Sequence, residues 1–224
     1  MKNKFFLVFF IVSQSMLSQE IFHEIEVGKK IIKPKGIIYN IDFNWKQDYK
    51  DFGWKRFGNN LAINKRFNSN WLATAGLESY YIADKNAPNF LELRPFLMMN
   101  LKTKITSRIY FAQFLKTEWR FFFYSNEQGN ENYHRLRYRT HFDIMAYSDS
   151  TKDISISIKP GIEWYLLHNI ANGERYANSR EYYLRFSIEK GLKEWNFGYK
   201  LETFFKTYNP NSANGNTIFF EYKF

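Results

Sequence analysis

The chain has 224 residues, of which 24% are charged and 21% aromatic, and its formal net charge is +10. It contains no cysteine, which excludes disulfides, thiolate metal sites and a lipid-modified N-terminal cysteine. The positive balance indicates contact with anions. For an exported chain, lipid phosphates are better candidates than nucleic acid, and a solvated, slightly basic surface is the simpler alternative.

Residues 1–19 have the pattern of an export signal. Lys2 and Lys4 precede an apolar run from Phe5 to Val12, and a small, polar region follows up to Gln19. The alternative is a short membrane anchor, but a membrane-spanning helix needs about 20 apolar residues and this run is much shorter. We therefore expect a signal peptide at 1–19.

Charged residues dominate 20–35, which is interpreted as a loose periplasmic N-terminal arm. From Gly36 onward, apolar and polar residues alternate with period two, as in half-buried strands. In one such run Ile154, Ile156 and Ile158 alternate with polar residues. The expected strands are at about 36–46, 55–67, 71–82, 90–102, 105–124, 133–147, 153–168, 180–190, 195–208 and 216–224.

The connections between these expected strands alternate between short and long. Short turns are expected near 68–70, 103–104, 148–152 and 191–194, with longer loops between the other strands. This alternation, together with an even number of strands, is typical of a transmembrane barrel with periplasmic turns and outer loops. The sequence thus predicts an all-β, antiparallel, up-and-down transmembrane β-barrel of about ten strands as one domain over 36–224.

Alternation alone does not decide which face lies inside. A soluble, lipocalin-like barrel would place the aromatic residues inside and the charges outside. Two features favour lipid outside: aromatic residues cluster near strand ends, as at Trp119 and Trp164, and the last strand carries Ile218, Phe220, Tyr222 and Phe224 on one face. We expect a bacterial outer-membrane protein whose Tyr222 and Phe224 form an assembly signal for the barrel-insertion machinery.

With the apolar face on lipid, the charged residues face the lumen. The expected lumen charge network consists of Glu78, Arg94, Glu118, Arg120, Arg135, Arg137, Arg139, Lys159, Glu163 and Arg185. Further inward residues are expected at Glu92, Lys116, His141, Asp143, Glu189 and Glu202. Register estimated from loop midpoints predicts four cross-strand pairs. These are Glu78–Arg94, Glu118–Arg139, Glu163–Arg185 and Lys159–Glu189.

Arg135, Arg137 and Arg139 form the densest charged run. Three adjacent guanidiniums repel one another unless acids or anions lie among them, and Glu118 and Glu163 are the nearest expected acids. One interpretation is an anion site or a selectivity constriction. The other is a structural plug of salt bridges, because barrels of about eight strands are filled by their own side chains.

The Glu118-Trp119-Arg120 strand, the polar loop after it and the Arg135-to-Arg139 strand carry a resemblance. The chain resembles a domain-of-unknown-function family of small bacterial outer-membrane barrels with Glu-x-Arg and Arg-x-Arg lumen strands. The resemblance covers about 36–224, and Glu78 and Glu163 fall where that pattern tends to have acids. This chain departs from it in its very aromatic lipid face and in Pro95 and Pro160 within strands. The resemblance implies a barrel and no known activity.

An enzyme is the remaining alternative. Ser125 lies near His134 at one outer loop, and His168 lies near Ser179 and Glu174 at another, as an outer-leaflet lipid-modifying hydrolase would require. No metal cluster, phosphate loop or nucleotide fingerprint is present in the sequence. We expect a non-enzymatic, monomeric barrel without cofactor that serves envelope structure or surface interaction, with a narrow pore for small anionic solutes as the alternative.

Overall fold

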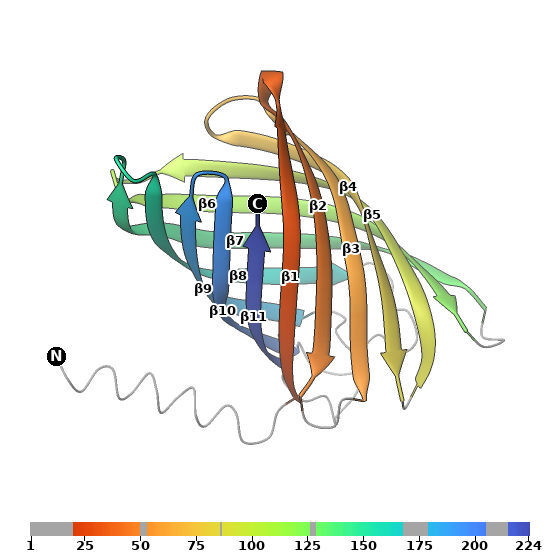
Figure 1. Cartoon of the computed structure of the whole chain (residues 1–224). Coiled ribbons are helices and arrows are strands. Elements are labelled where there is room, and N and C mark those ends of the chain that lie inside the picture. Colours follow the sequence, from red (N-terminus) through yellow and green to blue (C-terminus); the bar gives the residue numbers. More distant parts are fainter. Residues whose placement is uncertain (1–19, 50–52, 86, 126–128, 168–178, 205–214) are drawn as a thin grey trace, which may run out of the picture.

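A computed structural model describes residues 20–49, 53–85, 87–125, 129–167, 179–204 and 215–224. These residues form a closed barrel of eleven strands (Figure 1). The prediction of an all-β barrel of about ten strands is confirmed. The expected signal peptide at 1–19 lies outside the described residues and stays a prediction.

Each strand pairs antiparallel with its neighbour in sequence, and β1 and β11 close the barrel as a parallel pair. The short 3₁₀ turn η1 (Pro34–Gly36) joins β1 to β2. The strands are β1 (Glu20–Lys33), β2 (Ile37–Asp48), β3 (Trp54–Arg66), β4 (Trp71–Asp84), β5 (Ala87–Lys104), β6 (Ile109–Tyr124), β7 (Glu131–Asp149), β8 (Ile154–Leu167), β9 (Ser179–Lys190), β10 (Lys193–Phe204) and β11 (Gly215–Lys223). Pro95 and Pro160 both lie within strands, in β5 and β8.

The segment expected as a loose arm is a strand of the barrel wall. Glu20–Lys33 forms β1, which pairs with β2 on one side and with β11 on the other. The arm interpretation was therefore wrong, and so was the even number of strands. The physical reason is that Ile25 and Val27 alternate with Glu24 and Glu26, so this segment also has two faces.

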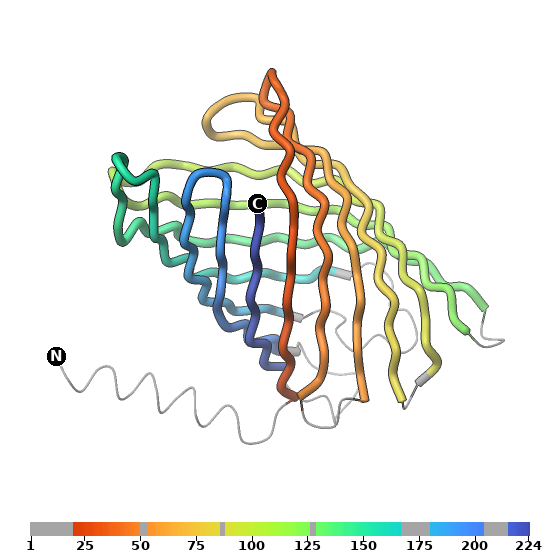
Figure 2. The backbone as a smooth tube through the Cα atoms, in the orientation of Figure 1, coloured from red at the N-terminus to blue at the C-terminus, as the bar shows by residue number. Residues whose placement is uncertain are grey.

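The two ends of the barrel differ in their connections. Short turns at 34–36, 67–70, 105–108, 150–153 and 191–192 lie at one end, called here the short-turn end. The chain ends there too, beside the β9–β10 hairpin in Figure 2. Because β1 runs parallel to β11, Glu20 lies at the opposite, long-loop end. Among the described residues, no helix is long and apolar enough to cross a membrane.

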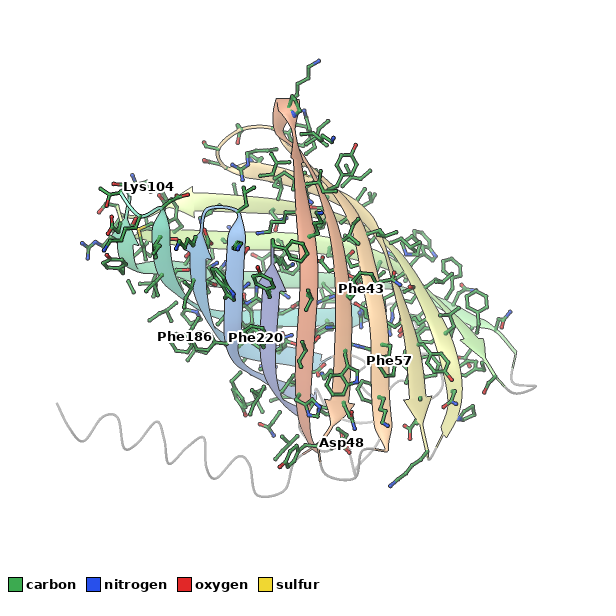
Figure 3. The ribbon with its side chains drawn as sticks, in the orientation of Figure 1. Phe43, Asp48, Phe57, Lys104, Phe186 and Phe220 are labelled. Carbon is green, nitrogen blue, oxygen red and sulfur yellow. The ribbon has the colours of Figure 1, made fainter. Side chains whose placement is uncertain are left out.

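The two faces of the barrel wall carry opposite kinds of side chain. Phe43 and Leu97 face outward and are 64% and 61% exposed. Glu118 and Glu163 face inward and are 1% and 0% exposed. Figure 3 shows Phe43 and Phe57 on the outer surface of β2 and β3. The wall of this barrel is thus apolar outside and carries its buried charges inside.

Aromatic rings also point inward, and several lie over a glycine of the neighbouring strand. A Cβ atom added to Gly76 would lie 2.6 Å from the Phe96 ring, and one added to Gly161 would lie 2.4 Å from the Tyr183 ring. The missing side chain makes room for a ring that fills the interior. The same arrangement recurs in four register pairs: Gly58–Tyr80, Gly76–Phe96, Gly161–Tyr183 and Gly198–Phe219.

Candidate functional site: the charged interior

Ten inward-facing charged residues on five consecutive strands form a cluster, called here the β4–β8 network. Period two in the sequence places them on one face of the wall, and the register of the strands brings them together. The network consists of Glu78, Glu92, Arg94, Lys116, Glu118, Arg120, Arg135, Arg137, Arg139 and Glu163.

Glu118 lies at the centre of the network. Its carboxylate forms ion pairs with Lys116 at 2.7 Å, with Arg135 at 2.7 Å and with Arg137 at 3.0 Å. Three cations around one fully buried carboxylate compensate the loss of its hydration, which would otherwise cost several kcal/mol.

Glu163 extends the network to β8. Arg137 Nε donates to one carboxylate oxygen at 2.6 Å, and Arg139 Nη2 donates to the other at 2.6 Å. Arg137 therefore bridges Glu118 and Glu163. The three adjacent guanidiniums of β7 are neutralised by these two acids, which sequence analysis named as their nearest candidates.

Glu92 and Glu78 complete the network on β4 and β5. Arg94 donates to both oxygens of Glu92 at 2.6 Å, and Arg120 Nε donates to Glu92 as well. Lys116 donates to Glu78 at 2.6 Å, and Arg94 lies 3.9 Å from the same carboxylate. The four acids are thus linked into one continuous chain of ion pairs, most of which are charge-assisted hydrogen bonds.

The cations of the network also lie over inward-facing aromatic rings. Lys116 Nζ is 4.1 Å from the centre of the Phe96 ring, and the guanidinium of Arg137 is 4.9 Å from that of Tyr165. Such contacts supply attraction in places where water is excluded. The other pairs are Arg94–Tyr80, Arg120–Phe122, Arg120–Tyr133, Arg135–Tyr165, Arg139–Phe114 and Arg139–Tyr183.

Strand register confirms one of the four predicted cross-strand pairs. Glu78 lies opposite Arg94, as expected. Glu118 lies opposite Arg135 and not opposite Arg139, since the β6–β7 connection is not centred on the midpoint used to estimate it.

The two predictions for the β8–β9 hairpin were wrong for the same reason. Glu163 lies opposite Glu181, and Lys159 lies opposite Arg185. Lys159 nevertheless reaches Glu189 at 3.8 Å along a diagonal.

Lys159 and Arg185 lie apart from the β4–β8 network, closer to the short-turn end. Arg185 pairs with Glu221 of β11 at 2.9 Å. Eight of the ten residues expected to form one lumen network are therefore brought together, and these two have acidic partners elsewhere.

Tyr222 and Phe224 lie on the outer face at the parallel seam. The Tyr222 ring stacks on Trp195 at 5.5 Å and on Phe224 at 5.7 Å between ring centres. The Phe224 N–H donates to the Gly28 carbonyl at 3.0 Å, and the Phe224 carbonyl accepts from the Lys30 N–H at 2.8 Å. Phe224 thereby extends the pairing of β11 with β1.

Sequence analysis missed a second charged cluster because it depends on β1. Glu24 accepts hydrogen bonds from Asn44 at 2.6 Å, from Arg56 at 3.0 Å and from Lys200 at 3.0 Å. The alternation of Glu24 and Glu26 with Ile25 and Val27 is the signal that would have placed this acid inside the barrel.

The hydrolase candidates can be located only in part. His134 lies on the outer face of β7, where its ring contacts the Thr117 hydroxyl and packs against Trp119. His168 and Glu174 lie outside the described residues. Within the described ranges, no group of three or more His, Asp or Glu side chains is placed to hold a metal ion.

Comparison with protein-family models and with curated proteins found no match for this chain. Acids held between cations and rings fill space and balance charge, and this arrangement is suited to closing a barrel.

Proposed function

We propose that the chain is an integral β-barrel protein of a bacterial outer membrane, with an interior closed by ion pairs and a non-enzymatic role in envelope structure or surface interaction. One observation carries this proposal: the exposed outer wall is apolar, while the acids inside are buried. A soluble barrel would have the reverse arrangement. A closed barrel also leaves no unpaired backbone groups in lipid.

The dimensions of the strands support the proposal. A transmembrane β-strand needs about 9–11 residues. The shortest strand, β11, has 9 residues and the longest, β7, has 19. Every strand is thus long enough to cross the hydrocarbon layer.

The closed interior follows from strand number and side-chain size. Barrels of about eight strands are filled by side chains, whereas porins of 16–18 strands leave a channel. Eleven strands fall nearer the filled class, and buried rings such as Phe96, Phe114 and Tyr165 occupy the space between the ion pairs. We propose a structural plug on this basis.

Membrane fractionation tests the location. The chain should be recovered in the outer-membrane fraction, and its gel mobility should change on heating, as is usual for folded barrels. Recovery as a soluble periplasmic protein would contradict the proposal.

A narrow path for small anions is the second candidate. It is favoured by the composition of the β4–β8 network, which has six cations and four carboxylates, and by the side chains of Arg137 and Arg139, which are 14% and 23% exposed. Conductance measurements in planar bilayers separate the two functions. Small anion-selective steps would favour the path, and the absence of steps would favour the plug.

The expected partners follow from the same proposal. They are outer-membrane lipid and the barrel-insertion machinery, with Tyr222 and Phe224 as the assembly signal and residues 1–19 as the export signal. Phe224→Ala should slow insertion by the purified machinery, whereas Phe197→Ala, at another exposed outer position, should insert at the parent's rate. The resemblance to small outer-membrane barrels stays a prediction.

A further inference from the structure

Much of the positive charge of the chain lies outside the ion-paired interior. At the short-turn end, exposed basic side chains occur at or beside every turn. We call this set the basic rim. It consists of Lys29, Lys33, Lys35, Arg66, Lys104, Arg108, Lys152, Lys190 and Lys193. The acids at the same turns are Asp153 and Glu189, which are exposed, and Asp149, which pairs with Lys152 at 3.5 Å. The rim is therefore strongly positive.

Large apolar side chains are exposed among these cations. Leu192 lies between Lys190 and Lys193 at the tip of the β9–β10 hairpin and is 65% exposed. Four of the five short turns carry such a residue, which we call an apolar tip. The tips are Ile32, Phe67, Ile105 and Leu192. A fully hydrated rim would gain nothing from exposed side chains of this kind.

The rim also surrounds the whole end of the barrel. Its turns join β1 to β2, β3 to β4, β5 to β6, β7 to β8 and β9 to β10, so they are distributed around the circumference. A protein partner would need one contiguous patch. A lipid leaflet meets the barrel on all sides and suits the repeated combination of a cation and an apolar tip.

We propose that the basic rim lies in the headgroup layer and binds the phosphates of anionic phospholipids, with the apolar tips inserted at the acyl boundary. This inference rests on the proposed function, since it needs a barrel that spans the bilayer. Basic residues near an anionic surface each strengthen binding to it, and their long apolar stems reach along the boundary while their charged ends stay at the phosphates.

The preference of the protein for anionic over neutral lipid tests directly whether the basic rim binds lipid phosphates. The full chain is reconstituted into phosphatidylcholine nanodiscs that contain trace spin-labelled phosphatidylglycerol or spin-labelled phosphatidylcholine. The immobilised fraction of each label is then compared. We expect phosphatidylglycerol to be enriched about fivefold at low salt, and most of this preference to disappear in about 1 M salt, where the screening length is about 3 Å.

Two double variants assign the preference to the rim. Lys190→Gln with Lys193→Gln removes two of the nine rim cations and should reduce the enrichment by about a fifth. Lys55→Gln with Lys85→Gln removes the same charge at the long-loop end and should leave the enrichment unchanged. All four side chains lie at the surface or near it, so both variants should fold.

Three outcomes overturn the inference. They are equal immobilisation of the two labels in the parent protein, an equal effect of the two double variants, and a selectivity that does not respond to salt. A chain that enters no bilayer, even a neutral one, overturns the proposed function itself. The two failures are therefore distinguishable.

Discussion

The carboxylate of Glu163 is held between two guanidiniums and has no exposed surface. A charge so placed is stable only as part of its network, because removing one member leaves the others desolvated and unpaired. Removing one charged residue from the interior should therefore cost more free energy of unfolding than the intact ion pairs contribute to net stability. A double-mutant cycle measures this difference.

Glu163→Gln should lower the free energy of unfolding by about 3–5 kcal/mol, because Arg137 and Arg139 lose their shared acid. Combining it with Arg139→Gln should recover part of that loss, with a coupling energy of about 1–3 kcal/mol. Urea unfolding in detergent micelles provides the measurement. Arg139 is the appropriate partner for Glu163, since the structure pairs Glu118 with Arg135 and Arg137 instead.

Glu189→Gln is the matched control for this cycle. Glu189 also has a basic partner, Lys159, but at 3.8 Å and with a side chain that is 51% exposed. An exposed pair is worth about 0–1 kcal/mol, so this variant should unfold almost as the parent does. Equal costs at Glu163 and Glu189 would mean that burial does not govern the network.

A charge introduced at Leu97 tests whether the outer wall faces lipid or water. Leu97 lies near the middle of β5 with most of its surface exposed. In a bilayer, Leu97→Arg should cost about 2–4 kcal/mol, whereas Ile105→Arg at a short turn should cost about 0–1 kcal/mol. In a soluble protein both changes would stay within about 0.5 kcal/mol. Unfolding from lipid bilayers distinguishes the two cases.

At the scale of the strand, the parallel pairing of β1 with β11 determines how the barrel closes. Period two is a local property, and it predicted the other ten strands from residues a few positions apart. The same signal exists in β1, where Phe22 and Glu24 face inward, but Lys29, Lys30 and Lys33 led to the interpretation as an arm. Sequence alone does not state which strands become partners across the seam.

Engineered cysteines test the seam, and the chain has none of its own to interfere. Ile25 and Phe220 are opposite each other in β1 and β11, so Ile25→Cys with Phe220→Cys should form a disulfide on mild oxidation. Trp45, opposite Ile25 on β2, lies two strands from β11, or about 10 Å. Trp45→Cys with Phe220→Cys should not cross-link, since that distance exceeds the reach of a disulfide.

The reverse result, in which only the Trp45 and Phe220 variant cross-links, would contradict β1 as a wall strand and favour a ten-stranded barrel with a free arm. A gel under non-reducing conditions reads out both variants. Because β2 would then neighbour β11, the Trp45 pair would be oxidised and the Ile25 pair would not.

Several glycines leave space for an aromatic ring of the neighbouring strand, so the two strands pack closely at these positions. A Cβ atom on Gly198 would lie 2.1 Å from the Leu184 carbonyl and 2.9 Å from the Phe219 ring. Gly198→Ala should therefore cost about 1–3 kcal/mol through overpacking. Gly129→Ala is the control, because nothing lies within 4 Å of its Cβ position. Thermal unfolding followed by far-UV circular dichroism compares the two variants.

For the whole molecule, strand faces could be predicted from sequence, but strand register was predicted correctly only for the β4–β5 hairpin. Glu118, Glu163 and the β7 arginines were placed inside correctly because alternation puts them on one face, and the aromatic residues near the strand ends indicated that the other face lies outside. Their exact partners depend on how each loop is centred, and an error of a few residues in a loop displaces every pair in that hairpin. The second cluster around Glu24 depended on β1 and was missed with it.

In the plug that we propose, the bulk of the inward-facing rings closes the interior together with the charges. Phe114 and Tyr165 are both buried, and the guanidiniums of Arg139 and Arg137 lie over them. Removing both rings should leave space for water and release two arginines to face it. We therefore expect the parent protein to show little or no conductance in planar bilayers, and Phe114→Ala with Tyr165→Ala to show anion-selective steps.

Tyr182→Ala with Leu184→Ala removes comparable bulk from the outer wall and should show no conductance steps. A large, steady conductance in the parent would contradict the closed interior and favour a porin, while a silent inner-ring variant that still folds would show that the charges alone close the barrel.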